Sequence, residues 1–136
     1  LASGVNVTFS TGIAWGFAGW LCVQLLPSLV LPPALPGFPY VDLTERQIWW
    51  VATVVLSIMG FWFFTLYKSN WFRALGVALL VAPHLYGAPR PLDMSSNVPA
   101  YLASQFVVST LATSLFVWLV MGIALGYLWD RTAKAA

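Results

Sequence analysis

Charged residues occur at only four places in this chain of 136 residues, and the uncharged intervals between them constrain its fold most. Residues 1–41, 47–67, 74–89 and 94–129 contain no Asp, Glu, Lys or Arg. A helix that crosses a membrane needs about 20 predominantly apolar residues. Charged residues make up 7% of the chain, whereas soluble domains carry roughly 25%. The pattern therefore predicts an integral membrane protein.

The uncharged intervals predict one all-α transmembrane domain over residues 1–136, a bundle of about four helices. We expect these helices at about 11–30, 43–67, 70–86 and 99–129. The third is expected to be proline-broken, because Pro83 lacks an N–H and its ring clashes with the preceding turn. An alternative has three spans, with the third helix as a re-entrant segment.

The positions of lysine and arginine predict the orientation of the chain in its membrane. Lys68 and Arg73 lie between the second and third helices, and Arg131 and Lys134 follow the fourth. Four alternating spans place both groups on one side, which the positive-inside rule makes cytoplasmic, together with the C-terminus. The three-span alternative would place the two groups on opposite sides.

Small residues recur at helical spacing in the first and fourth helices. Glycines four residues apart lie on one helix face and let a neighbouring backbone approach closely. We therefore predict a helix contact, within the chain or to a partner, through Gly12, Gly16, Gly19, Gly122 and Gly126. The alternative is chance, because glycine is frequent in membrane helices.

Polar residues inside the predicted spans are few, and unpaired polar groups are costly in lipid. Gln24 on the first helix, with Gln105 and Thr113 on the fourth, is a candidate polar path through the membrane. Close packing is the alternative, since hydroxyls can also bond to carbonyls of their own helix.

Several function classes are disfavoured. No span carries a charged residue near its middle, which argues against a proton relay or an ion pump built from this chain alone. The chain has one histidine, one cysteine and no glycine-rich phosphate loop, so we expect no enzyme. Its net charge of +2 and the lack of a basic run argue against nucleic-acid binding.

The single histidine, His84, lies in the stretch APHLYGAPRP, where the third helix is expected to end. Neutral imidazole is a ligand for cobalt, nickel, copper and zinc. Candidate companions on the same predicted side are Asp93, Asp42 and Glu45. Two alternatives remain: an imidazole that bonds carbonyls left free by Pro83, and an axial ligand to a pigment.

Four segments resemble, in order, the predicted cobalt transporter CbtA family. They are WGFAGWLCVQLLPSLVLPPALPG (15–37), DLTERQIWWVATVV (42–55), RALGVALLVAPHLYGAPRP (73–91) and VPAYLASQFVVSTLATSLFVWLVMGIALGYL (98–128). The resemblance implies a bacterial inner-membrane protein that takes up cobalt with a small, histidine-bearing one-helix partner, CbtB. Members are usually longer by about two N-terminal helices, so we expect the N-terminal part to be missing here.

One position departs from the family pattern. Family members often carry a second histidine after GAP, where this chain has Arg90, whose charge would repel a metal ion. Two functions follow: cobalt uptake in a CbtA-like protein, or an accessory transmembrane subunit of a larger membrane complex, photosynthetic or respiratory, that transports nothing.

Overall fold

The chain is described by a computed structural model that covers residues 8–39, 41–93 and 95–135. The regular elements of these ranges are all helical, in the order α1 (Phe9–Trp20), a π-helical turn η1 (Leu21–Leu25), α2 (Leu26–Ser28), α3 (Leu43–Leu66), α4 (Asn70–Tyr86) and α5 (Ala100–Ala135). The prediction of an all-α protein is confirmed. α1, η1 and α2 follow one another without a break and form one continuous helical segment.

Three helical segments of the described residues are long and apolar enough to cross a membrane, namely Phe9–Ser28, Leu43–Leu66 and Ala100–Ala133. The fourth, α4, has 17 residues and therefore spans about 26 Å at 1.5 Å per residue. That is slightly short of the ~30 Å hydrocarbon core of a bilayer. The chain is thus a membrane protein with three clear candidate spans and one shorter helix.

The first helical segment and α5 differ from their expected limits, and the first segment ends at Ser28, before the expected end at 30. α1 begins at Phe9, before the expected start at 11, because Thr8 and Thr11 form a reciprocal capping box. α5 continues to Ala135 instead of ending near 129. Residues 130–135 contain neither Gly nor Pro, so nothing in the sequence stops the helix where the charged residues begin.

Pro83 lies inside α4 and does not end it. The helix continues for one more turn to Tyr86 and stops at Gly87, whose φ of +87° favours glycine. The Gly87 N–H donates to the Pro83 carbonyl oxygen at 3.0 Å. The expected break at the proline is therefore displaced to the glycine that follows it.

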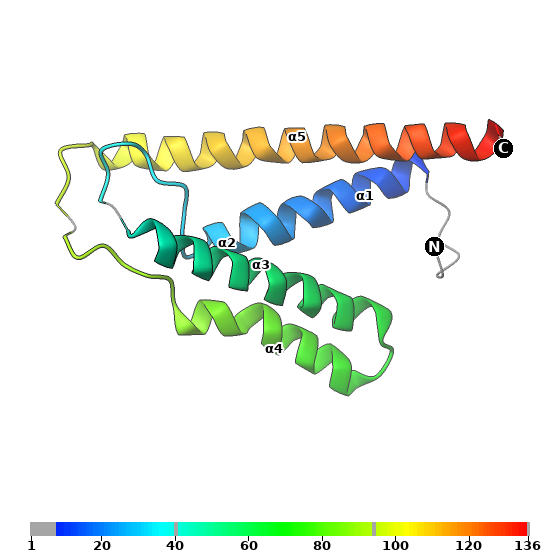
Figure 1. The fold of residues 1–136 in the computed structure, drawn as a ribbon, viewed down its shortest axis with the longest axis horizontal. Helices are drawn as coiled ribbons and strands as arrows, with labels where there is room; N and C mark the ends of the chain where they lie inside the picture. The colour runs from blue at the N-terminus through cyan, green and yellow to red at the C-terminus, as the bar shows by residue number, and fades with distance from the viewer. Residues whose placement is uncertain (1–7, 40, 94, 136) are drawn as a thin grey trace.

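The helices associate as two antiparallel pairs and do not share one central core (Figure 1). α1 packs along α5, and α3 packs along α4; η1 and α2 connect the pairs through contacts with α3, and η1 also contacts α5. Among the described elements, α4 contacts only α3. The loop residues 29–39, 41–42, 87–93 and 95–99 lie at one end of the molecule, which we call the loop end (Figure 1).

Glycines bring α1 and α5 into backbone contact. A β-carbon built on Gly16 would lie 2.5 Å from the carbonyl oxygen of Trp118, closer than real β-carbons come. Gly12 and Gly122 face each other in the same way. The glycines expected to mediate helix packing all lie on this contact, which is within the chain: Gly12, Gly16, Gly19, Gly122 and Gly126.

The α3–α4 pair uses one glycine from each helix. A β-carbon on Gly60 would lie 2.8 Å from the Gly76 carbonyl oxygen, and one on Gly76 would lie 2.6 Å from that of Gly60. Sequence reasoning missed this pair, because neither glycine has a second one at helical spacing. At the turn between the helices, the rings of Tyr67 and Phe72 stack with their centroids 4.4 Å apart.

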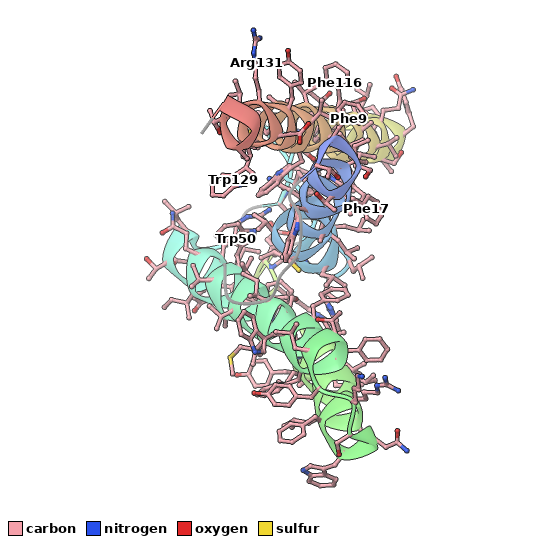
Figure 2. The ribbon with its side chains drawn as sticks, turned by 90° about the vertical axis from the view of Figure 1, so that its right-hand side faces the viewer. Phe9, Phe17, Trp50, Phe116, Trp129 and Arg131 are labelled. Carbon is pink, nitrogen blue, oxygen red and sulfur yellow. The ribbon has the colours of Figure 1, made fainter. Side chains whose placement is uncertain are left out.

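Large apolar side chains cover the outside of both pairs. In Figure 2, Phe116 and Arg131 extend from α5 away from the other helices. Trp15 is 67% exposed and Phe116 is 68% exposed, fractions that suit a surface in contact with lipid and not with water. The interior is correspondingly small, and its largest buried side chains are Trp20 and Trp49.

Candidate functional site

The chain's only histidine lies against a buried tryptophan near the loop end of the α3–α4 pair. The rings of His84 and Trp49 are arranged edge to face, with their centroids 6.5 Å apart. Trp49 is only 7% exposed. It comes from the second turn of α3, and His84 comes from the last turn of α4, so the antiparallel pairing of these helices brings them together.

The polar atoms of this ring pair have no hydrogen-bond partner among the described residues. Both ring nitrogens of His84 and the indole Nε1 of Trp49 are covered, and neither donates nor accepts a bond there. A buried polar group without a partner costs free energy of about 1–3 kcal/mol. The expectation that His84 bonds carbonyls freed by Pro83 is therefore wrong for this structure.

Trp49 belongs to a buried stripe on one face of α3 that also includes Thr53, Ser57 and Gly60. Thr53 and Ser57 have no exposed surface. The Thr53 hydroxyl donates to the Trp49 carbonyl oxygen at 2.9 Å, a bond within the helix. The Ser57 Oγ has no hydrogen-bond partner among the described residues, so the stripe, which continues to Gly60, contains a further unsatisfied polar atom.

A cavity of about 750 Å³ opens beside Trp49, between the first half of α3 and the end of α4. Glu45, Ile48 and Leu56 line it from α3, and Pro83 and Tyr86 line it from α4. Most of its lining is apolar, and Glu45 supplies its one charged group. The cavity is therefore a hydrophobic groove with a carboxylate at its loop end.

Two of the expected metal ligands have other roles. The Asp42 carboxylate caps α3, accepting from the backbone N–H of Thr44 at 2.9 Å and of Glu45 at 3.2 Å. The Asp93 carboxylate accepts from the backbone N–H and the hydroxyl of Ser95, each at 2.8 Å. These bonds, the backbone one foremost, hold the pKa of Asp93 below its usual value.

The four expected ligands do not form one metal centre. Within the part of the chain that the structure describes, no three His, Cys, Asp or Glu side chains come close enough to hold a metal ion. The carboxylates of Asp42 and Asp93 already accept hydrogen bonds from neighbouring residues, which leaves His84 and Glu45 as candidate ligands. Sequence reasoning overestimated the site because sharing one side of a membrane does not bring side chains together.

The expected polar path is divided among different surfaces. Gln24 is half-buried on η1, whereas Gln105 and Thr113 are exposed on α5. Gln105 lies in a shallow depression with Ser104 and Ser109. Ser114 has a structural role instead: its hydroxyl is 3.0 Å from the indole Nε1 of Trp20, which donates to it across the α1–α5 contact. A path through the three residues stays a prediction.

These features define a polytopic α-helical membrane protein with an apolar groove and an unpaired histidine near one end. Comparison with protein families shows that the model of one family, described as "Probable cobalt transporter subunit (CbtA)", matches residues 3–130. The chain belongs to this family, and the resemblance seen in the sequence is confirmed. No curated protein and no solved structure matches the chain.

The family suggests a subunit of a cobalt transporter rather than an enzyme. Membership of a family of transporter subunits, together with three candidate membrane spans in the described residues, implies lipid and other protein chains as partners.

Proposed function

We propose that this chain is the membrane-spanning subunit of a system that takes up divalent cobalt across a bacterial inner membrane. The observation that carries the proposal is the covered imidazole of His84, whose two nitrogens lack partners among the described residues. Neutral imidazole nitrogen is a good ligand for divalent cobalt. Glu45, which lines the neighbouring groove, supplies a carboxylate at the same end of the helix pair.

One histidine and one carboxylate from the same end of the helix pair would bind a metal ion only weakly and reversibly, unlike a site that stores the ion. A transported ion must bind well enough to be captured and weakly enough to be released, a requirement that channels also meet. The remaining ligands then come from water or from a partner subunit, for which a small, histidine-bearing one-helix protein of the CbtB kind is suited. Arg90 is exposed at this end and works against tight metal binding there.

We propose an orientation with the loop end outside the cytoplasm. The turn between α3 and α4, which carries Lys68, lies at the opposite end of the molecule, where α5 also ends (Figure 1). Arg73 is in the first turn of α4 and Arg131 is near the end of α5, and an excess of lysine and arginine marks the cytoplasmic side. His84 would then meet cobalt on the side from which uptake begins.

The test is cobalt uptake into right-side-out membrane vesicles from cells that produce the whole system. His84→Ala should reduce the initial uptake rate at least ten-fold, because it removes the only imidazole of the chain. Leu85→Ala is the matched control, since Leu85 is the next residue and is 82% exposed. Uptake by His84→Ala at the rate of the wild type and of the control would overturn the proposal.

A second candidate function is an accessory subunit that transports nothing. It is favoured by the absence of three gathered ligands in the described residues and by an outer face of α5 that exposes side chains such as Phe116. Mild solubilisation separates the two functions. A large complex that contains this chain in fixed ratio, without cobalt uptake, supports the accessory function.

A further inference from the structure

The groove beside Trp49 follows α3, so its length can be measured along that helix. Its lining runs along that helix from Glu45 to Leu56, a separation of 11 residue steps or about 17 Å at 1.5 Å per residue. Half of a ~30 Å hydrocarbon core is about 15 Å. The groove therefore extends over the depth of one leaflet of a bilayer, beginning close to the helix end that Asp42 caps.

The groove also opens towards the surrounding membrane. α3 and α4 approach each other closely at Gly60 and Gly76, whereas the groove lies between their other halves. Because α4 contacts only α3 among the described elements, no third helix packs on α4 to close the groove. Ile48 is 66% exposed, and Tyr86 is 89% exposed.

The groove lining is apolar over most of its length and charged at one end, as a bilayer leaflet is apolar inside and polar at its surface. Ile48, Ala52 and Leu56 form an apolar wall along α3, and the exposed carboxylate of Glu45 lies at the end nearest the membrane surface. The guanidinium of the adjacent Arg46 donates to the Pro32 carbonyl oxygen at 2.7 Å. That bond directs the Arg46 guanidinium to the loop before α3, and among the described residues Glu45 forms no ion pair.

We propose that this groove binds one phospholipid with an ammonium headgroup, such as phosphatidylethanolamine. One acyl chain lies between α3 and α4 along Ala52 and Leu56, and the ammonium group lies beside the Glu45 carboxylate. A volume of about 750 Å³ is far larger than an ion needs and lies within the 300–1,000 Å³ of sites for organic ligands. This proposal does not rest on cobalt transport.

The headgroup decides the preference for one lipid over another. Every membrane lipid offers acyl chains, and lipid gives no hydrophobic drive for packing in the bilayer. A carboxylate attracts an ammonium headgroup and repels a headgroup with net negative charge. We expect about a five-fold preference for phosphatidylethanolamine over phosphatidylglycerol, the size of effect that one exposed ion pair gives.

The experiment is native mass spectrometry of the detergent-solubilised full chain, mixed with equal amounts of phosphatidylethanolamine and phosphatidylglycerol. Ala52→Phe fills the groove and should reduce bound phosphatidylethanolamine at least five-fold. Val51→Phe is the control, because Val51 is 50% exposed on the same helix and does not line the groove. If Ala52→Phe does not fold, Ala82→Phe fills the groove from α4.

The charge is tested separately. Glu45→Gln should abolish the preference between the two lipids while an acyl chain still binds, and Asp130→Asn, at the far end of α5, should keep the preference (Figure 1). Wild-type protein that binds both lipids equally would overturn the proposal. So would full retention of phosphatidylethanolamine by both groove-filling variants, or an unchanged preference in Glu45→Gln.

Discussion

Gly12 of α1 and Gly122 of α5 lie in direct backbone contact: a β-carbon added to either glycine would overlap the carbonyl oxygen of the other. The two residues belong to the first and last helices that the structure describes, so this contact joins the two ends of the described fold. It also explains why α5 pairs with α1 and not with α4, which precedes it in the sequence.

Replacing Gly122 with alanine should weaken this helix pair. The added methyl group meets carbonyl and backbone atoms of α1 that cannot move independently of that helix, and overpacking of this kind costs about 1–3 kcal/mol. The free energy of unfolding, measured by circular dichroism during titration with a denaturing detergent, should fall by that amount. Ala124→Leu, at an exposed position of the same helix, should change it little; equal effects would contradict the assigned contact.

Replacing Trp20 with phenylalanine should also destabilise the α1–α5 pair. The indole N–H donates to the Ser114 hydroxyl at 3.0 Å and to the Leu111 carbonyl oxygen at 3.2 Å, and a net loss of about 0.5–1.5 kcal/mol is typical of a hydrogen bond. Ser114→Ala should cost less, because the Leu111 carbonyl remains as acceptor. The same detergent titration measures both variants, and a larger effect of Ser114→Ala would contradict this geometry.

The four helices should place the two loops that flank α4 on opposite sides of the membrane. In a Cys22→Ala background, which removes the only native cysteine, Ser69→Cys and Ser96→Cys introduce exposed thiols before and after α4. A membrane-impermeant maleimide added to intact cells should label position 96 and leave position 69 unlabelled. Labelling of both positions would mean that α4 does not span, and labelling of position 69 alone would invert the orientation.

Asp93 should titrate below the usual pKa of an aspartate. The backbone N–H and the hydroxyl of Ser95 both donate to its carboxylate and favour the charged form. Since the folded pKa lies below the unfolded one, any stability that the carboxylate adds is present above about pH 4 and is lost as the pH falls through the folded pKa.

The pKa of Asp93 can be measured by NMR of the labelled carboxyl carbon. Ser95→Ala should raise this pKa towards the ordinary value but not fully restore it, because the backbone N–H remains and is the larger cause. An unchanged pKa in Ser95→Ala would mean that the hydroxyl does not stabilise the carboxylate.

Sequence reasoning came closest to the structure wherever the signal is local. The limits 70–86 predicted for the third helix agree with α4, and the limits 43–67 agree with α3 to within one residue. Hydropathy and capping residues act over a few turns of chain, so they can be seen without the fold. The same reasoning placed the break of α4 at Pro83, but the helix ends at Gly87 because the last turn can accommodate the proline.

The site was harder to predict, because its parts come from separate helices. Nothing local in the sequence indicates that Trp49 lies against His84, or that Gly60 faces Gly76. Asp42 and Asp93 were expected to join His84, but each is already bonded to backbone groups nearby in the chain. A carboxylate that caps a helix has the same residue type as a metal ligand, and only its contacts distinguish the two roles.

The sequence by itself determined that this chain lies in a membrane, that its fold is all-helical and which family it belongs to, because composition, apolar length and motif order are properties of the chain. Only the tertiary structure decided which helices pair, that α4 packs on α3 alone, and that a leaflet-deep groove opens beside Trp49. Helix pairing depends on the fit of whole faces, in which one glycine on each helix sets how closely two backbones approach.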